Sequence, residues 1–363
     1  LIERIEKDST PLVKYSDLFK VGTTLYSTEK HEDTNLAKQK YENNKKVNDS
    51  YYPLVSAAGS IKAYLFTTPE RYVNYEYPAK FHRGLNINTF VGAKLVIPKR
   101  WPTKAVSVSD TVIFTEIFYI FKLRKDFTLA HISLFEAILN SKLAYFYLAS
   151  KYLQRPKGSF SEVNLGHLKK FPIPKLKNEE IIDQIVKVVA KIKEEKNIEK
   201  YQDQLDNLVF DLYDLDYYER QQINDYYAVQ KRKGNILINK RDMEDYIAEF
   251  INGINHFIEE GYFLNAEVYI CNFLGSLVKF KFSKSKEKVR FDESSDLKKL
   301  LGIIQYERIK DIKNILEEKE LRIYDDNVLY LYKSNHPKDW TRTKALDDVK
   351  REVGIIYQNL PES

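Results

Sequence analysis

The sequence of 363 residues contains a single cysteine, Cys271, only 12 glycines and no long apolar run. One cysteine cannot form an intramolecular disulfide or a cysteine-rich zinc site. No stretch approaches the roughly 18 to 20 apolar residues of a membrane-spanning helix. The first residues also lack the basic-then-apolar order of a signal peptide. These absences predict a cytoplasmic protein without a membrane partner, in which Cys271 fills an apolar core.

The signatures of several enzyme classes are missing as well. There is no Gly-x-Gly and no Pro-Pro pair, and the phosphate-binding Walker and dinucleotide fingerprints are also missing. The His-Glu-x-x-His zinc signature is absent too. Glu317-Glu318-Lys319-Glu320 offers the residue types of a nuclease site, but the pattern places them on a solvated helix end. We therefore predict no catalytic residue, metal or cofactor in this chain, although a site that only the fold assembles stays open.

The charge balance favours a polyanionic partner without requiring one. The formal net charge is +6 at pH 7, which suits nucleic acid. The abundance of Lys, Asn, Ile and Tyr is equally well explained by an AT-rich coding sequence. The chain begins at Leu1 rather than Met, so we expect a fragment whose N-terminal part is missing.

Residues 129–174 organise the rest of the chain. In their first part, apolar side chains recur at three- and four-residue steps, which predicts a long core helix. A polar loop follows that contains Arg155, Lys157, Gly158 and Ser159. The segment closes at Pro172-Ile173-Pro174, where two prolines prevent regular structure from continuing.

This block resembles the end of the target-recognition domain of Taq-type adenine DNA methyltransferases and of type I restriction specificity subunits. In those families a helix reading roughly Leu-Asn-Ser-Lys-Leu precedes a glycine-containing segment and a closing Pro-Ile-Pro. The matching pieces here are Leu139-Asn140-Ser141-Lys142-Leu143, Gly158 and Pro172-Ile173-Pro174. The resemblance implies binding of double-stranded DNA. It also implies that catalysis, with S-adenosylmethionine, belongs to a missing N-terminal catalytic domain of the same polypeptide.

Residues 51–127 have the composition of strands, being rich in Tyr, Val, Ile, Phe and Thr. The predicted strands cover 51–55, 63–67, 95–98, 105–108 and 111–123. Residues 114–121 are nearly continuous in aromatic and β-branched side chains, which predicts a central, doubly buried strand. The polar residues 31–50 are typical of an insertion or a mobile loop. Several short strands and one long helix predict an α+β domain.

Cationic residues lie between these strands, next to glycine or proline. A guanidinium beside a glycine can approach a phosphate or a guanine edge closely, and Trp101, Tyr72, Tyr75 and Tyr77 could stack on bases. The alternative is that the tyrosines alternate along an edge strand and Trp101 caps the core. With the loop after the core helix included, the predicted DNA-binding residues are Lys80, Arg83, Lys99, Arg100, Arg155, Lys157 and Ser159.

Two amphipathic helices are predicted after Pro174, over residues 179–196 and 201–215, and each needs a partner surface for its apolar stripe. In the resembled families helices also follow the recognition domain, and residues 205–215 are similar to their common ending. A basic connector at residues 231–234 then marks a boundary.

A separate, smaller α+β domain is predicted over residues 236–363. Its helices are expected at 243–260, 297–306 and 343–357, and its strands within 267–282 and 321–332. Residues 329–348 are similar to the C-terminal extension of some large single-chain adenine methyltransferases of phage-defence systems.

These inferences predict three parts: a DNA target-recognition domain at 1–176, a helical connector at 177–235 and the C-terminal α+β domain at 236–363. The expected function is sequence-specific DNA recognition for a bacterial adenine-N6 DNA methyltransferase or type II restriction-modification enzyme. Two alternatives stay open. One is a type I restriction specificity subunit, which usually needs a second recognition domain. The other is a protein-interaction scaffold without a nucleic-acid role, in which the helices over 179–215 pair with another chain.

Overall fold

The computed structural model describes residues 1–68, 71–153, 162–232, 237–271, 275–292, 320–325 and 327–358. Helices and strands are mixed along these ranges, which confirms the α+β class. The chain divides into two compact units, Leu1–Asp216 (unit 1) and Tyr217–Ser363 (unit 2). The three-part division at residues 176 and 235 stays a prediction about domain organisation. Within the described ranges, no helix is both long and apolar enough to cross a membrane.

Unit 1 contains two four-stranded sheets. In the first, of order β2-β11-β8-β9, strand β11 runs antiparallel to both β2 and β8. Its strands are β2 (Ser16–Val21), β11 (Phe118–Leu123), β8 (Lys94–Pro98) and β9 (Val106–Val108). The second sheet has the order β10-β4-β7-β3. Its strands are β10 (Ile113–Phe114), β4 (Tyr51–Val55), β7 (Tyr72–Asn74) and β3 (Glu42–Asn43). A short hairpin pairs β5 (Ile61–Lys62) with β6 (Leu65–Phe66).

The apolar run at residues 114–121 is not one strand. It splits between β10 and β11, which belong to different sheets, because the chain turns where the Phe118 N–H donates to the Thr115 carbonyl at 3.1 Å. The chain passes close to this turn just after β2, at Gly22. A Cβ on Gly22 would lie only 2.2 Å from the Thr115 carbonyl oxygen. The expected central, buried strand is therefore the shorter β11, whose residues 118–121 are buried.

One apolar cluster holds the two sheets together. It includes Leu54 and Val73 from the second sheet, and Val96 and Phe118 from the first. Residues 31–50, expected as an insertion or mobile loop, contain helix α2 (Thr34–Tyr41). The Asp33 carboxylate begins this helix by accepting hydrogen bonds from the N–H groups of Asn35 and Leu36, as an N-cap residue does.

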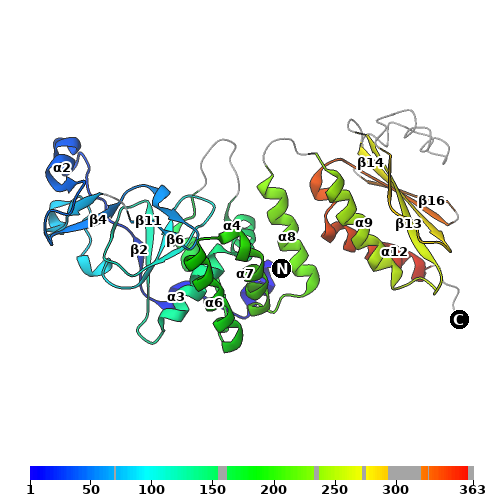
Figure 1. Ribbon diagram of the computed structural model, residues 1–363, viewed down its shortest axis with the longest axis horizontal. Helices are drawn as coiled ribbons and strands as arrows, with labels where there is room; N and C mark the ends of the chain where they lie inside the picture. The colour runs from blue at the N-terminus through cyan, green and yellow to red at the C-terminus, as the bar shows by residue number, and fades with distance from the viewer. Residues whose placement is uncertain are drawn as a thin grey trace. The chain divides into compact units, whose positions relative to one another are not determined.

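The helices α3, α4, α6 and α7 gather beside the strands of unit 1 (Figure 1). The expected single long helix is wrong, because it breaks at Ser141 into two. Ser141 has extended backbone angles, and its hydroxyl accepts the Ala144 N–H at 3.2 Å, so it caps the second helix. The bounds are α1 (Ile2–Lys7), α3 (Leu129–Asn140), α4 (Lys142–Tyr152), α5 (Leu165–Lys169), α6 (Glu179–Glu195) and α7 (Ile198–Leu212).

The apolar stripe of α6 is covered inside unit 1. Its side chains Ile185, Val189 and Ile192 are buried, and α6 packs against α3 and α7. This burial stabilises the helix pair through apolar area removed from water. The helices over 179–215 therefore do not present this stripe to another chain, so pairing with a partner would need a different surface of these helices.

The Pro-Ile-Pro segment forms a strand rather than ending regular structure. Strand β12 (Pro172–Pro174) pairs antiparallel with β1 (Ser9–Pro11), so that Thr10 lies opposite Ile173. The prolines are tolerated because the sheet has only these two edge strands. The Tyr213 hydroxyl, just after α7, donates to the Pro172 carbonyl at 2.7 Å.

Unit 2 is built on a five-stranded sheet of order β15-β13-β14-β17-β16. Helices α9 and α12 lie side by side against this sheet (Figure 1) and share its apolar core. The strands are β13 (Phe263–Cys271), β14 (Gly275–Ser283), β15 (Arg290–Asp292), β16 (Glu320–Asp325) and β17 (Val328–Lys333). The helices are α8 (Tyr217–Lys231), α9 (Lys240–Asn255) and α12 (Arg342–Gln358). The expected helix at 297–306, residues 317–319 and the Cys271 side chain lie outside the described residues.

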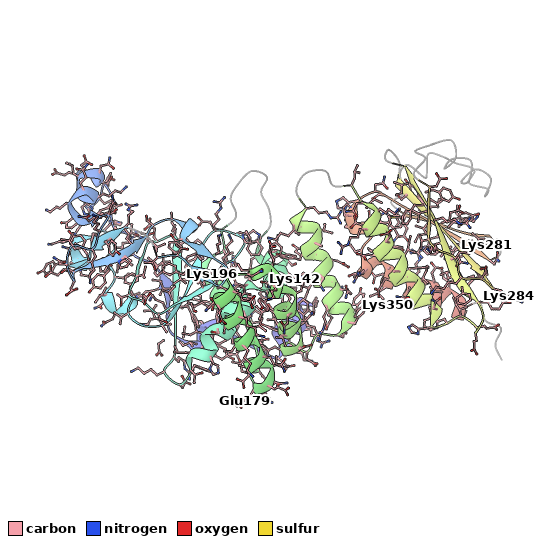
Figure 2. All side chains as sticks on the ribbon, viewed as in Figure 1. Lys142, Glu179, Lys196, Lys281, Lys284 and Lys350 are labelled. Carbon is pink, nitrogen blue, oxygen red and sulfur yellow. The ribbon has the colours of Figure 1, made fainter. Side chains whose placement is uncertain are left out.

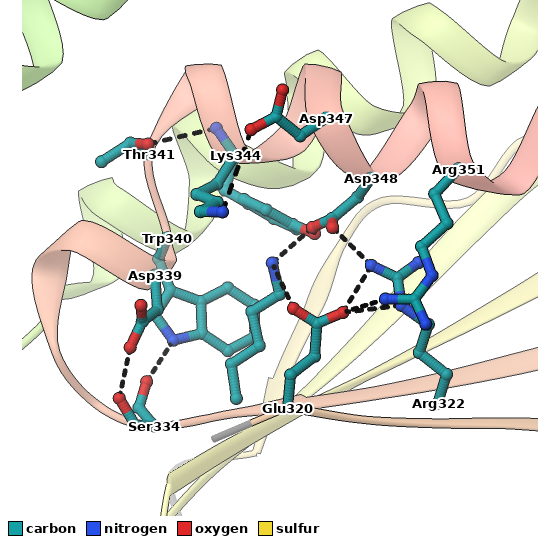
Figure 3. A network of polar contacts seen from close by, with 12 residues as sticks. Glu320, Arg322, Ser334, Asp339, Trp340, Thr341, Lys344, Asp347, Asp348 and Arg351 are labelled. Atoms are coloured by element: carbon teal, nitrogen blue, oxygen red, sulfur yellow. Dashed lines mark hydrogen bonds and ion pairs between the residues drawn. The ribbon is translucent and has the colours of Figure 1, made fainter. Parts of the chain in front are cut away.

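Charged side chains are buried where α12 meets β16 and β17 (Figure 3). Asp348 forms ion pairs with Arg322 and Lys333, and Arg322 also pairs with Glu352. Next to them, the indole N–H of the buried Trp340 donates to the Ser334 carbonyl at 2.7 Å. Residues 329–348, which resemble a methyltransferase extension, thus connect α12 to the sheet.

Candidate nucleic-acid interface

One end of the β2-β11-β8-β9 sheet gathers three of the predicted DNA-binding residues. Val21, at the end of β2, lies opposite Tyr119, and Pro98, at the end of β8, lies opposite Phe118. Strands β2 and β8 therefore both finish at the end of the sheet where β11 begins. We call Arg83, Lys99 and Arg100, whose backbones are bonded to the segments at this end of the sheet, the cationic edge.

Lys99 and Arg100 follow β8 directly. The Lys99 N–H donates to the Ile117 carbonyl at 2.9 Å, and the Lys99 carbonyl accepts the Val163 N–H at 2.9 Å. Arg100 forms a backbone bridge with Glu162. The ammonium of Lys99 lies 5.7 Å from the centre of the Tyr119 ring. Residues 99–100 are thus held between the turn before β11 and residues 162–163.

Arg83 reaches the same edge through the segment after β2. Its N–H donates to the Thr24 carbonyl at 2.9 Å, and its carbonyl accepts the Thr23 hydroxyl at 2.9 Å. Thr23 in turn bridges Thr115, in the turn before β11. The backbone of Arg83 is therefore fixed, while its side chain is exposed.

Gly84 has a structural role that differs from the one expected. A Cβ at this position would lie 1.8 Å from the Pro78 carbonyl oxygen. The glycine therefore permits a tight turn between Pro78 and Arg83, rather than clearing space for DNA. Lys80 lies within this turn, is exposed, and places its ammonium 4.4 Å from the centre of the Tyr77 ring.

The aromatic residues divide between core and surface. Tyr75 is only 1% exposed, and its hydroxyl contacts Thr23 and Leu85, so it is not available to stack on a base. Trp101 is half-buried against Tyr145, with ring centres 4.7 Å apart. Tyr72 is half-buried in β7, which is an inner strand of its sheet rather than an edge strand. Tyr77 is 54% exposed and stays available for stacking.

Carboxylates also lie at this end of the sheet. Glu162 forms a backbone bridge with Arg100, and Glu116 lies in the turn before β11. Burial raises the pKa of the Tyr119 hydroxyl, and the negative charge of Glu162 raises it further. Sequence reasoning missed both carboxylates, although Glu116, as a charge inside an apolar run, was a signal for the turn. Their charges partly offset those of the cationic edge.

Arg155, Lys157 and Ser159 lie outside the described residues. After the undescribed residues 154–161, the Val163 N–H donates to the Lys99 carbonyl. The described residues therefore resume, at Glu162, beside the cationic edge. In the ranges that the structure covers, no group of three or more His, Cys, Asp or Glu residues could hold a metal ion.

The Leu-Asn-Ser-Lys-Leu motif is a junction between elements. The Asn140 side chain pairs with both backbone groups of Ala105, at 2.7 and 2.8 Å. The Lys142 N–H donates to the Asp206 carboxylate at 2.8 Å. The motif thus ties α3 and α4 to the start of β9 and to α7, and it positions the sheet without contributing to a surface.

Residues 55–173 match the TaqI-like C-terminal specificity domain. The specificity-domain match contains all seven predicted DNA-binding residues, three strands of the first four-stranded sheet (β8, β9 and β11) and two of the second (β7 and β10). It supports a restriction-modification specificity domain within unit 1. No curated protein matches the sequence significantly.

Two solved chains show limited similarity in structure. One belongs to a study of complex assembly and conformational transition of the type I R-M system, at 14% identity and a TM-score of 0.29. The other is the HsdS subunit from Thermoanaerobacter tengcongensis, at 13% identity and a TM-score of 0.29. Each alignment covers 56% of this chain and 44% of the solved chain. At these TM-scores, no conclusion about this chain rests on either structure.

Proposed function

We propose that unit 1 binds duplex DNA and recognises its sequence as the specificity domain of a restriction-modification system. The observation that carries this proposal is the gathering of Arg83, Lys99 and Arg100 at one sheet end inside the matched residues. Lysine and arginine there would contact phosphates and so position the domain. Arg155, Lys157 and Ser159, which lie outside the described residues, would read base edges in the major groove.

We further propose that the recognition serves an adenine-N6 methyltransferase whose catalytic domain lies outside this chain. The resemblance of residues 139–174 and of residues 329–348 to such enzymes supports this assignment. A type I specificity subunit stays the second candidate. Such a subunit usually needs two recognition domains, whereas unit 2 has a single five-stranded sheet covered by helices, which differs from unit 1.

The proposal is tested by measuring affinity of the full chain for a labelled mixed-sequence duplex over a series of salt concentrations. Replacing Arg83, Lys99 and Arg100 with alanine removes three charges at the cationic edge. We expect an affinity loss of about tenfold and a log-log salt slope smaller by about 2 to 3 units. Circular dichroism checks that this variant is folded.

The matched control removes three exposed lysines near and on α6, namely Lys177, Lys187 and Lys191. This control loses the same net charge as the cationic-edge variant. If the cationic edge makes the DNA contacts, the control should keep wild-type affinity. Equal losses in both variants, or no binding of the wild-type chain at low salt, would contradict the proposal.

A further inference from the structure

A second cationic surface lies in unit 2, on and after strand β14. Residues 279–290 contain six cations and one carboxylate, Glu287. The cations are Lys279, Lys281, Lys284, Lys286, Lys288 and Arg290. We call these six residues the basic turn. Sequence reasoning assigned no partner to this part of the chain.

Asn265 of β13 bonds to both sides of the basic turn. The amide nitrogen of Asn265 donates to the Ser283 hydroxyl at 2.8 Å and to the Ser285 carbonyl at 2.9 Å. Its amide oxygen accepts the Glu287 N–H at 2.9 Å. Because a single side chain fastens both sides of the turn, its lysines are displayed from an ordered backbone. Such order lowers the entropy lost when a ligand binds.

The cations point away from the core of unit 2. Val278 and Phe280 are buried in the core that α9 and α12 cover, so Lys279 and Lys281 project from the opposite face of β14. There they line a polar cavity of about 120 Å³ together with Asn265, Arg290 and the two carboxylates Glu267 and Glu287. Figure 2 shows Lys281 and Lys284 on the strand side of unit 2 and Lys350 on α12.

Most of this positive charge is not neutralised within the protein. Lys279 lies 3.9 Å from Glu267, and Arg290 lies 3.2 Å from Glu287. Among the described residues, Lys281, Lys286 and Lys288 have no ion-pair or hydrogen-bond partner for their side chains, and all three are exposed. Like charges held near one another repel, and a polyanion relieves that repulsion.

We propose that the basic turn is a second binding surface for the phosphate backbone of duplex DNA, independent of sequence. This inference rests on the proposed function of unit 1. The cations are spaced along the end of β14 and the turn that follows it, and five of the six are exposed. That arrangement suits a linear polyanion, whose binding releases counterions for every phosphate contacted.

The test uses the full chain and a fluorescein-labelled duplex of mixed sequence, in a salt series. The variant Lys281→Ala, Lys284→Ala, Lys286→Ala removes three exposed cations of the basic turn. We expect an affinity about tenfold lower and a salt slope smaller by about 2 to 3 units. The control variant Lys338→Ala, Lys344→Ala, Lys350→Ala loses the same charge elsewhere in unit 2 and should bind like wild type. The variant Asn265→Ala keeps every cation and should lose less affinity.

The outcomes separate this inference from the proposal for unit 1. If only the cationic-edge variant loses affinity, the basic turn is not a DNA surface, while the proposed function stands. If only the basic-turn variant does, the proposed function fails and DNA contact by unit 2 remains. Equal losses in the basic-turn variant and its control overturn the inference. A further outcome also overturns the inference: the basic-turn variant binds DNA like wild type but no longer binds vesicles that contain phosphatidylglycerol. The surface would then recognise lipid.

Discussion

Asp206 of α7 is a carboxyl group buried where the break between α3 and α4 meets α7. It accepts the Lys142 N–H at 2.8 Å and the Gln202 amide at 3.2 Å, and the Lys142 ammonium lies 3.6 Å away. Burial nevertheless raises its pKa from 3.8 to about 6. The cost of removing the charge from water therefore exceeds the gain from its partners.

This raised pKa predicts a pH-dependent stability. The folded state holds the proton of Asp206 more tightly than the unfolded state does. The stability that this group contributes is therefore full below pH 3.8 and is lost as the pH rises through about 6. Asp206→Asn cannot titrate. Compared with this variant, the wild-type free energy of unfolding should fall by up to about 3 kcal/mol across this interval.

Urea unfolding of both proteins near pH 4 and near pH 7 measures this difference. The variant Asp183→Asn, at an exposed position of α6, is the control and should keep the wild-type pH profile. Parallel profiles for wild type and Asp206→Asn would show that the carboxyl does not titrate in this range.

At the scale of elements, the turn that presents Lys80 and Arg83 depends on Gly84. A Cβ there would meet the Pro78 carbonyl oxygen at 1.8 Å, whereas a Cβ on Gly59 would meet nothing within 4 Å. We expect Gly84→Ala to lower the free energy of unfolding by about 2 kcal/mol or more, because backbone must move. Gly59→Ala should change it by less than about 0.5 kcal/mol. Chemical denaturation measures both, and similar values for the two variants would contradict the model of the turn.

Sequence patterns predicted the helices and strands that depend on the periodicity and composition of their own residues. The strands near 51–55 and 95–98, the helix over 179–195 and the closing helix of unit 2 follow from periodicity and composition, and the structure contains them. The interruptions could not be placed in the same way. Ser141 breaks a helix through its own cap, and residues 115–117 turn because β2 crosses them at Gly22. Both depend on partners distant in the sequence.

The candidate site was predictable only in part, for the same reason. Residue type and neighbouring glycine or proline singled out Arg83, Lys99 and Arg100. The sheet register places Lys99 and Arg100 at one end of the sheet, and the backbone bridge to Thr24 joins Arg83 to the segment after β2. The pattern could not separate Tyr75, whose hydroxyl is satisfied in the core, from the exposed Tyr77. It also gave Gly84 a role toward DNA, where its contact is with Pro78. Alternation along a strand does not reveal which face another sheet covers.

At the scale of the whole molecule, each unit has its own apolar core and its own exposed cationic surface. Unit 1 contains the match to a specificity domain, and in our proposal it reads the sequence. In the further inference, unit 2 adds affinity through phosphates alone. The two surfaces should therefore differ in kind: a change in the loops beside the cationic edge should alter which sequence is bound, whereas a change in the basic turn should weaken binding to all sequences equally.

The most direct measurement is selection from a pool of duplexes with a randomised central segment, using the full chain and sequencing the bound fraction. Our account predicts that one short sequence is enriched over successive rounds. It also predicts that the basic-turn variant enriches the same sequence at lower yield. A bound fraction with the composition of the input pool would contradict the central claim, since the chain would then bind DNA only as a polycation.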